Sequence, residues 1–311
     1  MLRLFDVEGA MAEGDSPTIA RRRVRLVLRE AREKAELTQL QVAEEMEWSL
    51  SKVIRIENGD VTIAPNDLRP LLALLNIKDK ALIASLLTDT RAARTRQQAW
   101  YQKPEYRDHL TPALTRLIEY EAEATEFRYY QAYFMPGPFQ IPRYADALMG
   151  KLVDEMLEKT IKVRVATRSL RREAMLKRLN SIQVFMLLDE SVMLRPIGGA
   201  EVFAEQLSEL HRLATRGLAR IRIVPFELEG VLTNNATFDL LTLGSSEGEV
   251  LYRENGLTDE IVEDRAVTSR HHERFNKLWQ IATDENDTIE YIRGRLDKLQ
   301  ANIGKRSDDP H

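Results

Sequence analysis

Residues 38–59 read TQLQVAEEMEWSLSKVIRIENG, and this stretch decides the fold of the first part of the chain. Thr38 and Ser49 are hydroxyl residues of the kind that cap helix N-termini, and Gly59 suits the left-handed backbone that ends a helix. The spacing predicts a short helix after Thr38 and a second one between Ser49 and Gly59, joined by a tight turn. The apolar positions expected to form the buried seam between them are Val42, Ala43, Met46, Val53 and Ile56.

The outward side of the second predicted helix carries side chains that suit the edges of DNA bases. Two short helices joined by a tight turn form a helix-turn-helix, which places its second helix in the major groove. Ser51 is short and lies near the start of this helix, whereas Lys52 and Arg55 are long and lie further on. This gradient suits a helix whose N-terminal end enters the groove, so the pattern predicts DNA binding.

The stretch TQLQVAEEM…SLSKVIRIENG resembles the lambda-repressor-like (Xre) family of helix-turn-helix transcriptional regulators. The resemblance implies that Gln39 docks the first of the two helices on a phosphate. It also implies a phosphate contact for Lys52, and Arg55 would read a guanine through its two-pronged donor geometry. Arg32 and Glu57 match a structural ion pair of the family, which ties the first helix of the domain to the recognition helix.

The turn between the two helices departs from the family pattern, because Glu47 stands where glycine is usual. A left-handed backbone at a residue with a side chain costs about 1 kcal/mol. We therefore expect a slightly altered turn within an otherwise preserved motif. Further breaks between helices are expected at residues 37–38 and at Asn76.

Residues 20–34 add a basic helix, with seven basic side chains against two acidic ones. Such a cluster can be an ordinary solvated helix face, but beside a helix-turn-helix we expect it to contact phosphates. The residues expected at the DNA are Gln39, Ser49, Leu50, Ser51, Lys52, Arg55, Arg21, Arg22 and Arg23.

The charge of the chain is unevenly distributed. All 311 residues together carry a formal net charge of −4, which argues against a protein that coats nucleic acid indiscriminately. Residues 1–100 hold 16 basic and 15 acidic side chains, net +1, and the remainder holds 29 and 34, net −5. A local basic footprint on an acidic protein predicts specific DNA binding with suppressed non-specific binding.

Several kinds of chemistry are excluded or left without support. The chain has no cysteine, which rules out disulfides, cysteine-ligated metal centres and thiol catalysis. None of the five histidines has a metal-ligand spacing and no phosphate-binding glycine loop is present, so we expect no metal and no cofactor. Without a run of about 18 apolar residues or a signal peptide, we expect a cytoplasmic, nucleoid-associated protein with no membrane partner.

One string fits a catalytic pattern. Residues 244–248, GSSEG, match the GxSxG sequence of a serine nucleophile, which needs a strand, a sharp turn and then a helix. Here β-prone residues flank the string on both sides. We therefore interpret it as a hairpin loop and expect no enzyme.

The sequence predicts an all-α N-terminal helix-turn-helix domain of about five helices, followed by a mixed α/β C-terminal domain with a small sheet. A polar, basic stretch with two prolines marks the connector. The expected divisions are a disordered leader at 1–17, the DNA-binding domain at 18–90, a linker at 91–112, an effector-binding or partner-binding and dimerisation domain at 113–303, and a disordered tail at 304–311. Within the C-terminal domain we expect helices over 114–133, 144–157, 161–179, 200–215, 260–282 and 287–302, and strands over 182–188, 219–226, 237–243 and 249–253.

Residues 118–148, IEYEAEATEFRYYQAYFMPGPFQIPRYADAL, resemble the region around a PGLLQT motif in actinobacterial Xre regulators of the WhiJ-like type, whose C-terminal domain has no assigned function. The resemblance implies a very small partner protein encoded nearby, and a homodimer is expected because a helix-turn-helix protein commonly binds two half-sites. It further implies an antitoxin-like role, or control of development or secondary metabolism. This sequence departs from the pattern at Pro138, Phe139, Ile141 and Arg172, so its partner or ligand can differ.

Aromatic residues cluster around this motif, and two interpretations of them stay open. Pro136-Gly137-Pro138 ends one element and starts a rigid corner, which can simply be a packing elbow. Alternatively, the corner is the rim of a groove for a partner or ligand. The residues expected to line such a groove are Tyr129, Tyr133, Phe134, Gln140 and Tyr144, with Tyr130 beside them.

The leading hypothesis is a dimeric transcriptional regulator that binds operator DNA, with the C-terminal domain sensing a small protein or a ligand. One alternative is an antitoxin-like component of a two-protein pair. Another is an enzyme domain tethered to a helix-turn-helix, which would need titratable residues that converge in a pocket, and the sequence shows no such spacing.

Overall fold

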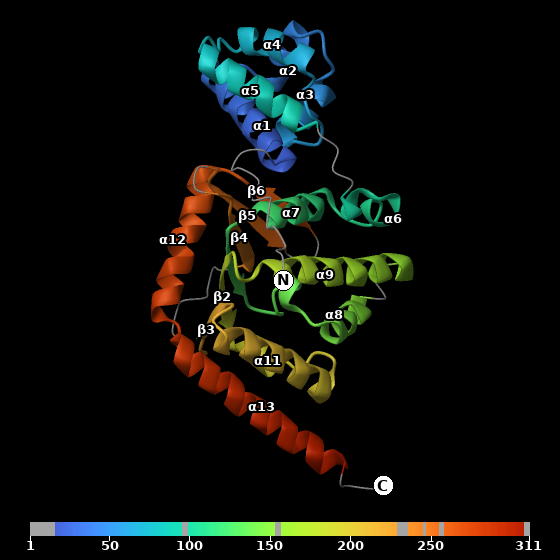
Figure 1. Cartoon of the computed structure of the whole chain (residues 1–311), viewed down its shortest axis with the longest axis vertical. Helices are drawn as coiled ribbons and strands as arrows, with labels where there is room; N and C mark the ends of the chain where they lie inside the picture. Colours follow the sequence, from blue (N-terminus) through green and yellow to red (C-terminus); the bar gives the residue numbers. More distant parts are fainter. Residues whose placement is uncertain are drawn as a thin grey trace, which may run out of the picture. The chain divides into compact units, whose positions relative to one another are not determined.

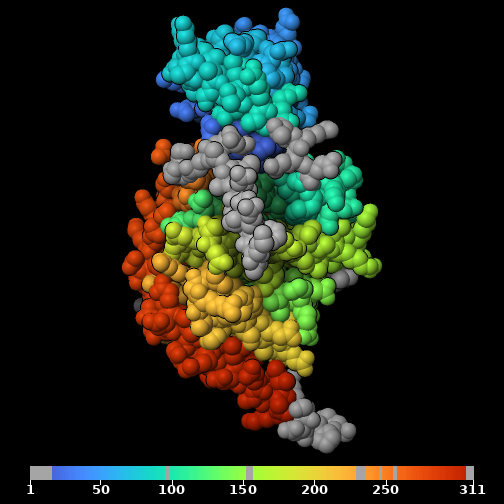
Figure 2. Space-filling view, viewed as in Figure 1, coloured from blue at the N-terminus to red at the C-terminus, as the bar shows by residue number. Residues whose placement is uncertain are grey.

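The computed structural model describes residues 16–94, 99–152, 157–228, 236–244, 247–254 and 258–307. The chain divides into two compact units, residues 1–97 and 98–311. Figure 1 labels the elements of both units, and Figure 2 shows the same units in space-filling form. Each unit is described by itself below.

The first unit is all-helical in its described part, as the sequence predicts. Apolar residues from all five helices and the loops between them meet in one core, which includes Leu28, Val53 and Leu68. The helices are α1 (Pro17–Lys34), α2 (Gln39–Glu45), α3 (Leu50–Asn58), α4 (Pro65–Leu74) and α5 (Lys80–Ala92).

A left-handed residue lies in three of the four expected breaks between these helices and directly before the fourth, at residues 37–38. Glu36, Glu47, Gly59 and Asn76 have φ values of 56°, 54°, 80° and 58°. Gly59 ends α3, as predicted. Glu47 also has a left-handed backbone, so the expectation of an altered turn is wrong at this residue: the chain adopts the conformation although a side chain is present.

The second unit is built on a six-stranded mixed sheet with strand order β3-β2-β1-β4-β5-β6. β1, β2 and β3 are parallel, and the remaining neighbours pair antiparallel. The mixed α/β fold class is thus confirmed. The strands are β1 (Glu126–Gln131), β2 (Gln183–Asp189), β3 (Arg220–Val224), β4 (Phe238–Thr242), β5 (Glu249–Glu254) and β6 (Asp259–Val262).

Helices cover both faces of this sheet. Phe275 and Leu278 of one helix, α12, pack on a cluster that includes Tyr130 and Leu240. On the other side, α9 packs beside α7 and α8 (Figure 1). The α-helices are α6 (Pro104–Arg107), α7 (Pro112–Glu123), α8 (Pro142–Met149), α9 (Glu158–Arg178), α10 (Glu190–Leu194), α11 (Gly199–Thr215), α12 (Arg265–Ile281) and α13 (Glu285–Ser307), and the 3₁₀ turns are η1 (Trp100–Gln102), η2 (Gly137–Phe139) and η3 (Gly150–Leu152).

The predicted helix over residues 114–133 is wrong in its second half, where the structure has β1. Tyr129 and Tyr130 are neighbours in this strand, yet both are only 1% exposed. A strand covered on both faces shows no alternation of apolar and polar residues, so its pattern does not separate it from a helix. The aromatic enrichment of β1 was the usable signal.

Two further expectations need correction. The predicted helix over 260–282 contains β6 at its start, because α12 begins only after Asp264, whose Oδ1 accepts the Val267 N–H at 2.9 Å. The stretch predicted as a linker holds the 3₁₀ turn η1 and the short helix α6 in its described part, and residues from 98 onward belong to the second compact unit.

We predict that Glu47→Gly stabilises the first unit by about 0.5–1 kcal/mol, since glycine adopts a left-handed backbone without the steric cost of a Cβ. Urea unfolding followed by the fluorescence of the adjacent Trp48 measures this change. Glu44→Gly, inside α2, is the matched control and should cost about 1 kcal/mol. A loss of stability in Glu47→Gly would contradict the left-handed turn.

Candidate nucleic-acid interface

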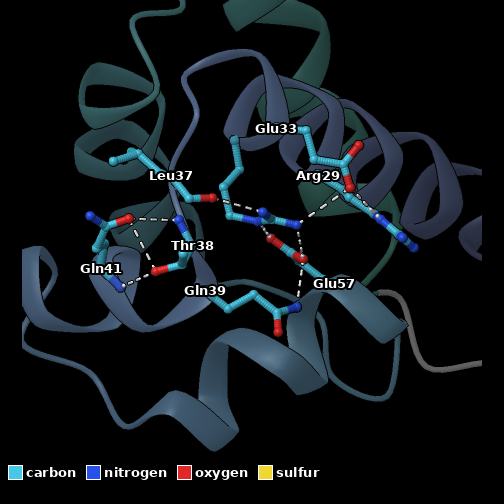
Figure 3. A network of polar contacts seen from close by, with 8 residues as sticks. Arg29, Glu33, Leu37, Thr38, Gln39, Gln41 and Glu57 are labelled. Atoms are coloured by element: carbon cyan, nitrogen blue, oxygen red, sulfur yellow. Dashed lines mark hydrogen bonds and ion pairs between the residues drawn. The ribbon is translucent and has the colours of Figure 1, made fainter.

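The second helix of the motif, α3, is capped and oriented by its own sequence. The Ser49 Oγ accepts the backbone N–H of Lys52 at 3.2 Å, as its N-cap position predicts. Thr38 caps α2 in the same way and forms a capping box with Gln41 (Figure 3). Both caps satisfy backbone donors that a helix start leaves free, so the two helices begin at fixed residues.

The two sides of α3 differ sharply in exposure. Val53, Ile56 and Glu57 are buried, at 4%, 4% and 6% exposure. Leu50 is 40% exposed, and Ser51 and Arg55 are exposed as well. The helix therefore presents to solvent an apolar side chain, a hydroxyl and a guanidinium.

A buried ion pair holds α3 against α1. Arg32 donates from Nε to Glu57 Oε1 at 2.5 Å and from Nη2 to Glu57 Oε2 at 3.0 Å. Its Nη1 donates to the backbone carbonyl of Leu37 at 2.8 Å. The hydrogen bond with Glu57 raises the pKa of Arg32 despite partial burial. The structural ion pair that the resemblance implies is thus confirmed.

Gln39 belongs to the same network, which the sequence did not reveal. Its Nε2 donates to Glu57 Oε2 at 2.7 Å, so the side chain lies across the start of α2 against α3 (Figure 3). An amide nitrogen carries two N–H donors, and one remains for a phosphate. The predicted phosphate contact of Gln39 stays a prediction, and the side chain is already held in place.

Lys52 differs from the expectation of a simple phosphate contact. Its Nζ forms an ion pair with Asp67 of α4 at 2.8 Å and lies 3.8 Å above the centre of the Trp48 ring. Arg55 is the contrasting case: its side chain forms no hydrogen bond or ion pair with any residue that the structure describes. Arg55 can therefore contact DNA without first leaving another residue, whereas Lys52 would have to leave Asp67.

The three arginines at the start of α1 do not form one solvated basic face. Arg23 pairs with Asp89 of α5 at 3.0 Å, Arg22 is 5% exposed, and Arg21 is partly buried. Arg23 meets Asp89 because α1 packs on α5, a long-range contact that the sequence does not reveal. Arg22 is therefore buried and Arg23 is already paired, so neither belongs to the proposed DNA interface.

Comparisons with known proteins agree with this geometry. Residues 24–86 match the model of a helix-turn-helix domain, and residues 114–294 match the family described as domain of unknown function (DUF5753). The chain belongs to the DUF5753 family. No curated protein and no solved structure matches it. This DUF5753 protein thus carries a helix-turn-helix DNA-binding domain before its α/β unit.

In the DUF5753 region, three of the five suggested groove residues are core residues. Tyr129 and Tyr144 are 1% exposed and Gln140 is 5% exposed. Gln140 Nε2 donates to the carbonyl of Met135 at 2.8 Å, and the Met135 N–H donates to the Tyr144 hydroxyl at 3.4 Å. These contacts favour the packing-elbow interpretation for the corner that follows β1.

The two other groove candidates are open to solvent. Tyr133 is 55% exposed and Phe134 is 39% exposed, with ring centroids 6.3 Å apart. They follow β1 directly, and the sequence could not separate them from their buried neighbours because all are aromatic. An exposed aromatic pair is the part of the predicted groove that stays available to a partner.

Two other expectations concern the rest of the chain. The GSSEG string joins β4 to β5, which pair antiparallel, so a strand and not a helix follows it; Ser245 and Ser246 lie outside the described residues. Among the helices that the structure describes, none is long and apolar enough to span a membrane.

We predict that Glu57→Gln destabilises the first unit by about 3 kcal/mol, because Arg32 would lose its buried counter-ion and keep only the exposed Glu33 at 3.5 Å. Urea unfolding followed by Trp48 fluorescence is the measurement. The control is Glu33→Gln: this carboxylate is 54% exposed and pairs with Arg29 at 3.0 Å, so its loss should cost less than about 1 kcal/mol. Equal effects of the two variants would contradict a special role for Glu57.

Proposed function

We propose that this protein is a sequence-specific transcriptional regulator that reads operator DNA through α3 in the major groove. The observation that carries the proposal is the division of α3 into a buried side, fixed by Glu57, and an exposed side with Leu50, Ser51 and Arg55. A helix held in this way keeps its orientation when it enters a groove, so its exposed side chains meet defined base pairs.

Arg55, Leu50 and Ser51 each match a known kind of base contact. The fork of Arg55 fits the O6 and N7 acceptors of guanine, and the apolar Leu50 fits the methyl group of thymine. The Ser51 hydroxyl can donate to or accept from either kind of base edge. Leu40 of α2 is 53% exposed and adds an apolar side chain that the sequence analysis did not single out.

Contacts to the phosphates would position the helix without reading sequence. Gln39 offers its remaining N–H, and Lys52 offers its ammonium group if Asp67 gives it up to a phosphate. Ser49 stays an N-cap whose hydroxyl lies at the same end of α3. Arg21 completes the set as a phosphate contact from α1.

We further propose a homodimer that binds two half-sites about 34 Å apart, which would match one turn of the duplex. The second unit would supply the dimer contact and bind a small partner protein or a ligand that changes DNA affinity. The exposed pair Tyr133 and Phe134 supports a partner surface. Control of development or secondary metabolism, and nucleoid association, belong to the same proposal and follow from the resemblance.

We predict that Arg55→Ala weakens binding to the preferred DNA sequence by about 1–3 kcal/mol and relaxes the preference at one base pair. Selection of binding sites from a random DNA pool, followed by titration of the recovered site, measures both effects. Arg91→Ala is the matched control, because Arg91 is an exposed arginine on α5, and it should leave both unchanged. Unchanged base preference in Arg55→Ala would remove Arg55 from recognition.

We also predict that a fragment ending at residue 95 folds, since its five helices share one core, but binds the recovered site about 100-fold more weakly. The reason is that a monomer engages a single half-site. Titration of the same DNA with fragment and full chain measures the difference. Equally tight binding by the fragment would exclude the second unit from dimerisation.

A further inference from the structure

Helix α9 turns a row of arginines toward the interior of the second unit. Arg164, Arg168 and Arg171 are spaced four and three residues apart, so they share one face of the helix. Arg171 is buried, and the Nε atoms of Arg164 and Arg168 are shielded from solvent. Three guanidinium groups in one row repel each other unless anions lie between them.

Arg171, at the inner end of this row, is fully occupied. Its Nε and Nη2 donate to the two carboxylate oxygens of Glu121 at 2.8 and 2.6 Å. Burial alone would lower the pKa of Arg171, but the charge and hydrogen bonds of Glu121 raise it. The backbone of Gly137 covers the remaining side, where a Cβ would lie 3.2 Å from Arg171 Nη1. The guanidinium of Arg171 is therefore already paired and covered, and it is not the part of the row that meets a ligand.

Arg164 and Arg168 have no comparable partner. Neither forms a hydrogen bond or an ion pair within the part of the chain that the structure describes. Burial lowers the pKa of Arg168 to about 10, and Arg171 and Arg164 act in the same direction, while Glu254 and Tyr252 oppose them. A shielded cation of this kind destabilises the fold until an anion pairs with it.

The neighbouring carboxylates on the sheet are committed elsewhere. Strand register places Tyr129, Asp239 and Tyr252 side by side on β1, β4 and β5. Asp239 accepts from Gln131 Nε2 at 2.7 Å, and burial above all raises its pKa to about 7. The Tyr252 hydroxyl donates to Asp259 at 3.3 Å. This leaves the exposed Glu254, whose charge raises the pKa of Arg168, as a competitor for an external anion.

We propose that Arg164 and Arg168 form a binding site for the oxyanion group of a small molecule, a carboxylate or a phosphate. Guanidinium groups bind both through paired N–H donors, and the adjacent arginine side chains supply two such forks. The inference deepens the ligand part of the proposed function by naming the chemistry of the effector. It is tested without DNA, so the two can fail separately.

The test is thermal unfolding of the full chain in phosphate and in succinate, each against chloride at equal ionic strength and pH. We expect one or both oxyanions to raise the Tm of the second unit by about 2–4 °C. Arg168→Met should abolish this rise and should also increase the Tm in chloride, because it removes an unpaired charge. A merely structural arginine would give the opposite result in chloride.

Four further variants complete the test. Arg164→Gln should reduce the rise in Tm that the oxyanions cause. This variant tests the proposed site if Arg168→Met does not fold. Glu254→Gln should enlarge the effect by removing the competitor. Lys177→Met, an exposed cation on the same helix, and Arg55→Ala should respond like the unchanged protein, which separates this site from the DNA-binding unit. No rise above chloride with either oxyanion, or a rise that persists in Arg168→Met, would overturn the proposal.

Discussion

The ion pair between Arg32 and Glu57 is the constraint on which the DNA-binding unit depends. One guanidinium joins α1 to α3 and to the carbonyl of Leu37, and the same carboxylate receives Gln39 from α2. Three helices and one turn therefore meet at a single shielded charge pair (Figure 3). Buried pairs contribute more to a unique geometry than to stability, and here the geometry is the orientation of α3.

This orientation explains why the surrounding side chains divide as they do. Because Glu57 faces inward, Leu50, Ser51 and Arg55 face solvent, and Arg55 has no described partner to lose on meeting DNA. Lys52 is held by Asp67 and Trp48, which favours a positioning role over base recognition. In the second unit, Glu121 pairs with Arg171, while the side chains of Arg164 and Arg168 have no partner among the described residues.

The sequence predicted the first unit well because its signals are local. The caps of α2 and α3 lie next to the helices that they start or end, at Thr38, Ser49 and Gly59. The family resemblance was enough to predict the ion pair between Arg32 and Glu57. The pairing of Arg23 with Asp89 was not predictable, since it depends on the packing of α1 against α5. In the second unit, β1 was not predicted because a strand covered on both faces shows no alternation of apolar and polar residues. β6 was not predicted because the start of α12 is marked only by the N-cap at Asp264, which follows the strand. For the groove candidates, residue type alone could not distinguish buried Tyr129 from exposed Tyr133.

The central claim is that α3 reads bases from the major groove, and interference by guanine methylation tests it most directly. A methyl group on N7 occupies the major groove, where Arg55 would bind. In the DNA sequence selected by the full chain, we expect that N7 methylation of one guanine in each half-site prevents binding. Arg55→Ala should no longer sense that methyl group. Binding that is insensitive to N7 methylation throughout the selected site, or equal sensitivity with and without Arg55, would contradict the account.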